Sequence, residues 1–144
     1  MAVTSRFLVE RNVGRLVEAR IWRLNTAEDA DDYAAAVIAA AAAGEGKPVL
    51  CADHRAANIY PPVVAGRLAL AFLPNNNRFE RIAIVALREN ALLLMQLQRL
   101  TREAGTAQRR VCLEPSEAID HLKSGLNADE LSRAMSFLTP PAQP

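Results

Sequence analysis

The stretch KPVLCADHR, residues 47–55, decides the fold of this chain. It is apolar up to Ala52 and then changes abruptly to three ionisable side chains. A short, nearly continuous apolar run is typical of a strand that is buried on both faces, as the strands of a parallel sheet are. The same pattern recurs in RIAIVAL (81–87) and in RRVCL (109–113). The sequence therefore predicts a buried, mainly parallel sheet with the first of these runs as a central strand.

Helical segments alternate with these strands. PPVVAGRLALAFL (61–73) begins with prolines, which a first helical turn tolerates, and is followed by strong turn residues. The segment 89–105 places leucines at helical spacing and ends in a glycine. A further helix begins at Pro115 and ends by Gly125. Helices between short buried strands imply right-handed crossovers and parallel pairing.

The N-terminal part has a different pattern. FLVE (7–10) and RLVEARIWRL (15–24) are separated by the turn residues of RNVG, which predicts an antiparallel hairpin. A helix should follow from an N-cap at Asn25 or Thr26 to a stop at Gly44. The predicted fold class is therefore α/β, with an N-terminal antiparallel hairpin followed by alternating helices and parallel strands. We expect about five strands and four helices, plus one extra C-terminal helix.

The C-terminal part extends this unit. We predict an α/β domain over 1–125, an additional amphipathic helix over 126–138 that is capped by Asn127, and a flexible tail over 139–144. The apolar stripe of the added helix has to be buried, either on its own domain or on a second copy in a homodimer. The residues predicted for such an assembly contact are Leu131, Ala134, Met135 and Leu138.

Composition limits the class of protein. Seventeen basic and sixteen acidic residues leave a net charge of +1 over 144 residues, so nothing favours nucleic acid as a partner. The first residues lack the apolar stretch of a signal peptide, and no uncharged run approaches the roughly 20 residues of a membrane span. We expect a cytoplasmic protein without membrane insertion. Cys51 and Cys112 lie in apolar runs and are predicted to be buried core residues.

The succession of elements resembles the STAS domain family, which includes bacterial antagonists of anti-sigma factors and cytoplasmic domains of anion transporters. The resemblance covers roughly residues 7–123 and is closest where RIAIVA is followed by a helix and then by RRVCLEPSEAIDHL. It concerns the order of elements and a few weak motifs, so it implies function only by analogy. The resemblance implies a non-enzymatic domain that binds another protein in bacterial regulation or signalling.

One property of the STAS antagonists does not carry over. In those proteins a serine at the start of the helix after the first parallel strand is phosphorylated by the partner kinase. The matching place here is Asn58 to Pro62, and there is no Ser or Thr anywhere between Lys47 and Arg99. We therefore expect binding without a phosphoserine switch. The surface that remains is the loop and helix start at the carboxyl edge of the sheet.

Asp53, His54 and Arg55 are the first candidates for an active site. Catalysis would need them to converge on one reacting atom, which consecutive residues leaving a strand seldom do. No nucleophile elbow, phosphate loop or metal-ligand spacing occurs, so we predict no catalytic residue, no metal and no cofactor. The favoured interpretation is that Asp53 braces the loop through backbone N–H groups while His54 and Arg55 lie in solvent.

Other side chains could join the same edge. Tyr60 is either an exposed aromatic anchor for a partner or a packed residue at the start of a helix. The apolar run from Leu92 to Met95 is wider than one buried stripe requires, which indicates a pocket or a contact surface. The arginine pairs Arg99/Arg102 and Arg109/Arg110 are predicted to be solvated.

The leading hypothesis is a protein-binding domain that uses the 53–62 loop and the following helix. The first alternative is a carrier of a lipid or other small apolar ligand, and the second is an enzyme that uses Asp53 and His54. The residues predicted to contact a partner protein are Asp53, His54, Arg55, Asn58, Ile59, Tyr60, Arg88 and Asn90.

Overall fold

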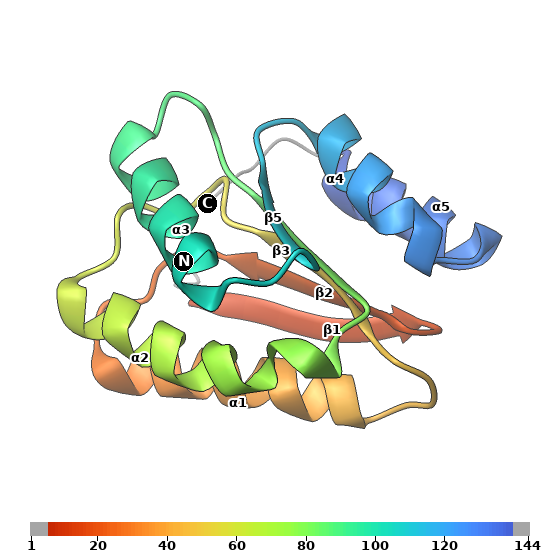
Figure 1. Ribbon diagram of the computed structural model, residues 1–144, viewed down its shortest axis with the longest axis horizontal. Helices are drawn as coiled ribbons and strands as arrows, with labels where there is room; N and C mark the ends of the chain where they lie inside the picture. Colours follow the sequence, from red (N-terminus) through yellow and green to blue (C-terminus); the bar gives the residue numbers. More distant parts are fainter. Residues whose placement is uncertain (1–5, 140–144) are drawn as a thin grey trace, which may run out of the picture.

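The computed structural model describes residues 6–139, which form one five-stranded sheet with helices on both faces (Figure 1). The strands lie side by side in the order of the chain, β1-β2-β3-β4-β5. β1 and β2 are antiparallel, and β2 to β5 are mutually parallel. The elements are β1 (Phe7–Val13), β2 (Leu16–Ile21), α1 (Ala27–Ala42), β3 (Val49–Asp53), α2 (Pro62–Phe72), the 3₁₀ helix η1 (Leu73–Arg78), β4 (Arg81–Val85), α3 (Ala91–Ala104), β5 (Arg109–Cys112), α4 (Pro115–Leu122), η2 (Lys123–Gly125) and α5 (Ala128–Leu138). The predicted α/β fold class is confirmed.

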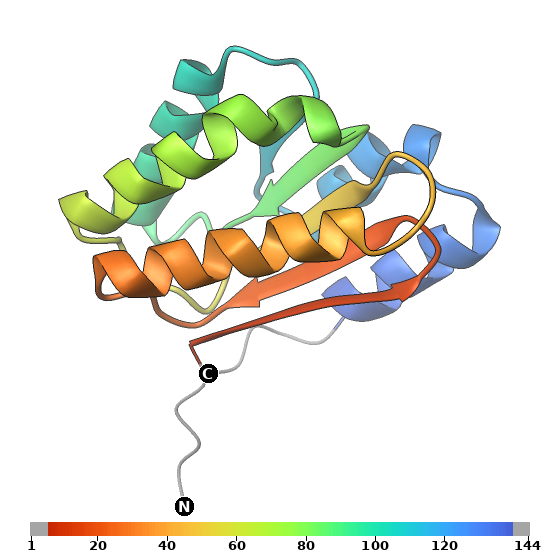
Figure 2. The same ribbon diagram turned by 90° about the horizontal axis from the view of Figure 1, so that it is seen from below.

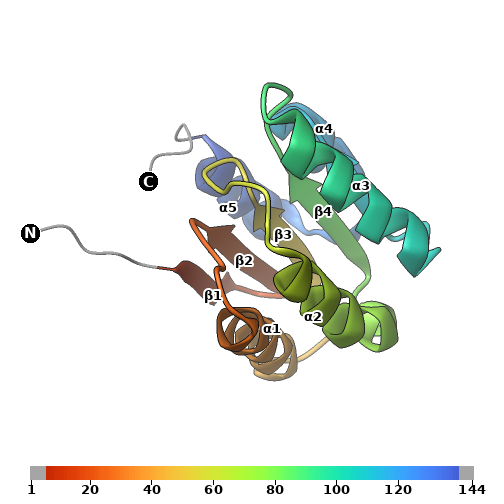
Figure 3. The same ribbon diagram turned by 90° about the vertical axis from the view of Figure 1, so that its left-hand side faces the viewer.

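The sheet forms the central layer of the fold, and its two faces are covered by different numbers of helices. Helices α1, α2 and α3 cover one face, with α1 and α2 side by side, while α4 and α5 cover the other (Figures 1 and 2). Figure 3 shows the strands in sequence from the hairpin edge at β1 towards β4. Because side chains alternate along a strand, β3 sends Leu50 and Ala52 to the α1–α3 face and Val49 and Cys51 to the α4–α5 face. Every residue of β3 is buried, as its apolar run predicted.

Both cysteines lie in the core beneath α4 and α5. Cys51 and Cys112 are free thiols and both are buried, which confirms the prediction from their apolar surroundings. Burial raises the pKa of the Cys112 thiol to about 11 and that of Cys51 further. These thiols are therefore packing groups rather than nucleophiles.

The helix ends follow local signals in the sequence. Thr26 begins α1 with a capping box, in which its hydroxyl accepts from the Asp29 N–H and the Asp29 carboxylate accepts from the Thr26 N–H. The helix ends at Ala42, slightly before the predicted stop at Gly44. Gly105 ends α3 in the left-handed conformation, at φ 64°, as predicted.

Helix α5 packs on its own sheet. Asn127 and Glu130 form a capping box at its start, and Ala134 and Leu138 are buried in the core of the α4–α5 face. These two residues of the predicted assembly stripe are therefore covered within the chain, because α5 supplies the lid that this face of the sheet requires. Leu131 is half-buried, and the Met135 side chain is exposed. The tail predicted over 139–144 lies, apart from its first residue, outside the described residues.

Glu130 joins α5 to the hairpin turn. Its carboxylate is buried and accepts from the backbone N–H groups of Arg15, at 2.6 Å, and Asn127, at 2.8 Å. Burial alone would raise the pKa of Glu130, but these hydrogen bonds outweigh it and lower the pKa below its usual value. The turn comes this close because Gly14 has no side chain: an added Cβ would collide with the Glu130 carboxylate.

Replacing Gly14 by alanine is expected to lower the free energy of unfolding by about 1–3 kcal/mol, because the residue has a φ of +54° and faces Glu130. Gly66→Ala in α2 is the matched control, since its Cβ meets nothing within 4 Å and it should raise stability by about 0.5–1 kcal/mol. Urea denaturation of both variants measures the difference. Two variants of equal stability would show that the turn and α5 do not depend on each other.

Candidate functional site

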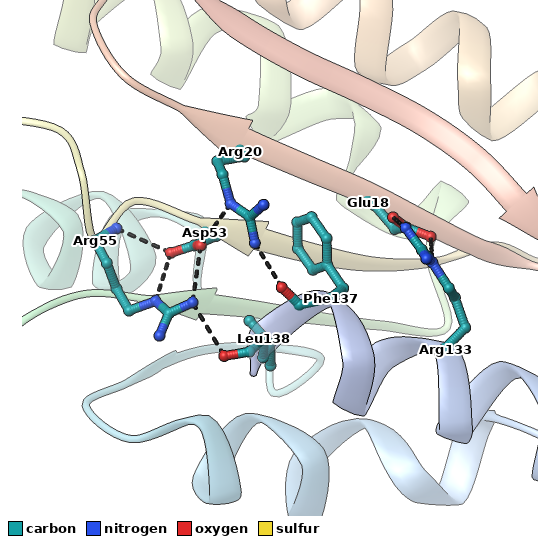
Figure 4. Close-up of polar contacts among 7 residues, drawn as sticks. All are labelled: Glu18, Arg20, Asp53, Arg55, Arg133, Phe137 and Leu138. Carbon is teal, nitrogen blue, oxygen red and sulfur yellow. Dashed lines mark hydrogen bonds and ion pairs between the residues drawn. The ribbon is translucent and has the colours of Figure 1, made fainter. Parts of the chain in front are cut away.

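Asp53 lies at the carboxyl end of β3 and is fully buried. Its Oδ2 accepts from Arg20 Nε at 2.9 Å, and its Oδ1 accepts from Arg55 Nε at 2.9 Å (Figure 4). Arg55 also donates its backbone N–H to Oδ1 at 3.0 Å and its Nη2 to Oδ2 at 3.1 Å. The predicted bracing of the loop by Asp53 through a backbone N–H group is confirmed. The carboxylate has its acceptor positions filled and is held as an anion.

The two arginines continue from Asp53 to the end of α5. Arg20 donates from Nη2 to the Phe137 carbonyl at 2.5 Å and stacks over the Phe137 ring, 4.3 Å from its centroid. Arg55 donates from Nη2 to the Leu138 carbonyl at 3.2 Å. The last carbonyls of a helix carry partial negative charge and have no partner in the helix, so cations suit them. Asp53, Arg20 and Arg55 thus fix the C-terminal end of α5 to the edge of the sheet.

A second ion pair fastens the same helix one turn earlier. Arg133 donates from Nε and Nη2 to the two oxygens of Glu18, each at 2.6 Å, in a bidentate arrangement (Figure 4). Glu18 is buried on β2, on the same face as Arg20 two residues later. These contacts add to the apolar packing of α5.

The pKa of Asp53 reflects two opposing effects. Burial by itself would raise the pKa, but the hydrogen bonds from Arg55 and Arg20 outweigh burial and lower it below the ordinary value. A carboxylate in this state does not take up a proton near neutral pH. Its hydrogen bonds with Arg20 and Arg55 give it a structural role at the end of β3.

His54 points to the opposite face of the sheet from Asp53. It is buried, and its Nδ1 lies 2.7 Å from the Tyr60 hydroxyl. Burial lowers the pKa of His54 to about 4, so the ring is neutral near pH 7. Since Asp53 and His54 lie on different faces, the structure does not bring this pair together at one reacting atom.

The prediction that His54 and Arg55 lie in solvent was wrong. His54 is buried, and the Arg55 side chain is only 8% exposed because Asp53 holds it back against the sheet. Tyr60 does not project as an aromatic anchor. Its ring is buried against His54, with centroids 5.9 Å apart, and burial raises its pKa. The packed alternative for Tyr60 is the one observed.

The loop after β3 is attached to α3. Tyr60 donates its N–H to Gln96 Oε1, and Gln96 Nε2 donates to the Tyr60 carbonyl, both at 2.9 Å. Asn90 Nδ2 donates to the Ala57 carbonyl at 2.9 Å. The predicted partner residue Asn90 therefore positions the loop, and the loop and α3 present one continuous edge.

The exposed residues of this edge form what we call the rim. Ile59, Val63, Leu92 and Met95 are large apolar side chains with 49–64% of their surface exposed. Asn58 and Arg88 are exposed at the same edge. Sequence analysis did not select Val63, Leu92 or Met95 as site residues, although the apolar run from Leu92 to Met95 was the available signal. The rim comprises Asn58, Ile59, Val63, Arg88, Leu92 and Met95.

Two kinds of feature are absent from residues 6–139, the part of the chain that the structure describes. No helix in this range has the length and apolar character to cross a bilayer. No three His, Cys, Asp or Glu side chains in the same range are placed to share a metal ion.

No family model, curated protein or solved structure matches this chain. The likeness to STAS domains therefore remains a hypothesis that rests on the order of the elements.

Asp53→Asn is expected to lower the free energy of unfolding by about 3 kcal/mol, because it leaves Arg20 and Arg55 without their buried counter-ion. Asp120→Asn is the matched control, since Asp120 is 74% exposed and its pair with Lys123 should change stability by no more than about 0.5 kcal/mol. Chemical denaturation at pH 7 compares the two. Similar losses in both variants would contradict a buried ionic network.

His54 should make stability depend on pH. Its pKa is about 4 in the folded chain and near the ordinary 6.5 in the unfolded chain, so the unfolded chain takes up the proton first as pH falls. The contribution of neutral His54 to the free energy of unfolding is fully present above about pH 6.5, and it is lost as the pH falls towards 4. Between pH 7 and pH 5 the wild type should lose about 2 kcal/mol more than His54→Gln. Equal losses in the two proteins, measured by urea denaturation, would show that His54 is not held neutral.

Proposed function

We propose that this chain is a non-enzymatic, STAS-like domain that binds another protein through the rim, without a phosphoserine switch. The observation that carries the proposal is the group of large apolar side chains exposed on adjoining, well-fixed elements at the carboxyl edge of the sheet. The buried members of the predicted surface, Asp53, His54, Arg55 and Tyr60, hold the loop from beneath. The exposed residues of the rim would make the contact with the partner.

The charge around the rim suggests the chemistry of the partner. Leu92, Met95 and Gln96 line a shallow groove with Arg99 and Arg102. Arg88 lies in the turn that leads into α3 and is exposed. A partner segment with apolar side chains flanked by carboxylates would complement this surface in shape and charge. We propose such an acidic, apolar segment of a regulatory protein as the occupant.

The fixed backbone of the rim supports this function. The loop is held by side-chain hydrogen bonds from Gln96 and Asn90 and by the His54–Tyr60 contact. A loop that is already ordered loses little conformational freedom on binding, which favours affinity. A role in bacterial regulation or signalling remains the setting that the STAS resemblance implies.

Ile59→Asp and Leu92→Asp are expected to weaken partner binding about tenfold or more, because each places a charge at the centre of an apolar contact. Leu70→Asp is the matched control, since Leu70 is 73% exposed on α2 outside the rim. The four chains are first immobilised and exposed to a cell extract. The partner is the protein that wild type and Leu70→Asp retain and that Ile59→Asp and Leu92→Asp do not. It is then purified and titrated calorimetrically against all four chains.

Circular dichroism and thermal melting check that the rim variants remain folded, as exposed substitutions should. A partner that binds all four chains equally would refute the rim as its contact surface. Equal loss of binding in Leu70→Asp would place the contact elsewhere on α2.

A further inference from the structure

A cavity lies between the sheet and the helices of the α1–α3 face. It has a volume of about 40 Å³ and is walled by side chains of β3, β4, α2 and α3, most of them apolar. Leu50 and Ile84 contribute from the sheet, and Leu68, Phe72 and Leu97 contribute from the helices. It also has polar lining groups from α1, η1, α3, β5 and the loop after β3, which a cavity left by imperfect apolar packing would not have.

Arg109 is the cation in this cavity. It lies on the edge strand β5, on the same face as Val111, and so points towards the cavity beneath α2 and α3. Its Nη1 donates to Asn76 Oδ1 at 3.2 Å, and its guanidinium lies 5.7 Å from the centroid of the Phe72 ring. Arg109 was predicted to be solvated, but it is half-buried because the helices cover part of its side chain.

The guanidinium of Arg109 is incompletely satisfied. Within the described chain, its Nε is one of two buried side-chain polar atoms without a hydrogen-bond partner, and no carboxylate pairs with it. Burial lowers the pKa of Arg109. The Arg109 side chain is half-buried, but its Nε is fully covered and lacks an acceptor, so an anion from outside the chain would offset the unfavourable burial of this charge.

Four other polar residues line the same cavity: Tyr33, His54, Asn76 and Glu103. Arg109 is close enough to His54 and Tyr33 to influence the pKa of each. Tyr33 is held in place by edge-to-face contacts with the Phe7 and Phe72 rings. A neutral imidazole and a phenol thus lie near the guanidinium, and most of the remaining lining is apolar.

A groove between α2 and α3 adjoins the cavity. Ala69, Leu100 and Glu103 line both spaces. Small residues form the α2 side of the groove, and a Cβ added at Gly66 would meet nothing within 4 Å. Pro62, Ala69 and Leu100 give the groove an apolar wall, and Gln96, Arg99 and Glu103 also line it.

We infer that this chain binds a medium-chain monocarboxylate, with the carboxylate on Arg109 in the cavity and the hydrocarbon chain in the groove between α2 and α3. One water-sized group needs roughly 10–15 Å³, so the cavity takes about three or four non-hydrogen atoms, enough for a carboxylate and its neighbouring carbon. A single negative charge matches the single unpaired guanidinium, and carboxylate geometry matches its donors. The site contains none of the six residues that define the rim, and binding there does not require a protein partner.

Sodium octanoate is the probe, and 1-octanol is the uncharged comparison. Calorimetric titration of the full chain should give a dissociation constant for octanoate at least about tenfold below that for octanol, because only octanoate pairs with Arg109. In Arg109→Met this preference should vanish. The variant should fold and melt no lower than the wild type without ligand, since an apolar side chain replaces a half-buried charge that has no counter-ion.

Gly66→Leu tests the groove separately. It should weaken octanoate binding about tenfold by filling the channel, whereas Ala39→Leu, on the exposed side of α1, should leave binding unchanged. Circular dichroism confirms that each variant is folded. The inference is overturned if wild type binds octanol as tightly as octanoate, if it binds neither, or if Arg109→Met retains the preference.

Discussion

The carboxylate of Asp53, held between two arginines, is the interaction on which the carboxyl edge of this sheet depends. It is fully buried, and Arg20 and Arg55 reach beyond it to the last carbonyls of α5. One anion therefore sets the direction of the chain after β3 and the position of the C-terminal helix. Without it, two guanidinium groups would lie against the sheet with no counter-ion, which is costly in a low-dielectric setting.

The two faces of the sheet are closed by different means. On the α4–α5 face, apolar packing is reinforced by Glu18–Arg133 and by the contacts of Glu130 with the hairpin turn. On the other face, α2 and α3 leave a cavity and a groove between them, with Arg109 inside. The tightly packed α4–α5 face keeps the sheet rigid, and this rigidity helps to hold the binding residues of the opposite face in place. Both proposed sites lie on the less tightly closed side, where ligands have access.

Gln96 and His54 connect the ligand site to the loop of the rim. Gln96 holds the backbone of Tyr60 through two hydrogen bonds, and its side chain also lines the groove between α2 and α3. A hydrocarbon chain in that groove would therefore lie against the residue that positions the loop of the rim. His54 makes a similar connection, since it bonds to Tyr60 on one side and faces the cavity on the other. The two residues that hold Tyr60 in the loop, His54 and Gln96, therefore both border the proposed ligand site.

The sequence by itself determined the order of elements, because uninterrupted apolar runs and helical spacing report burial locally. It also determined that Asp53 braces its own loop, since the Arg55 N–H it binds is two residues away. It could not place Arg20 on a carbonyl 117 residues distant, nor show that Arg109 turns inward. A charged side chain is exposed or buried according to which helices cover it. Only the tertiary structure decided that, because the covering elements come from distant parts of the chain.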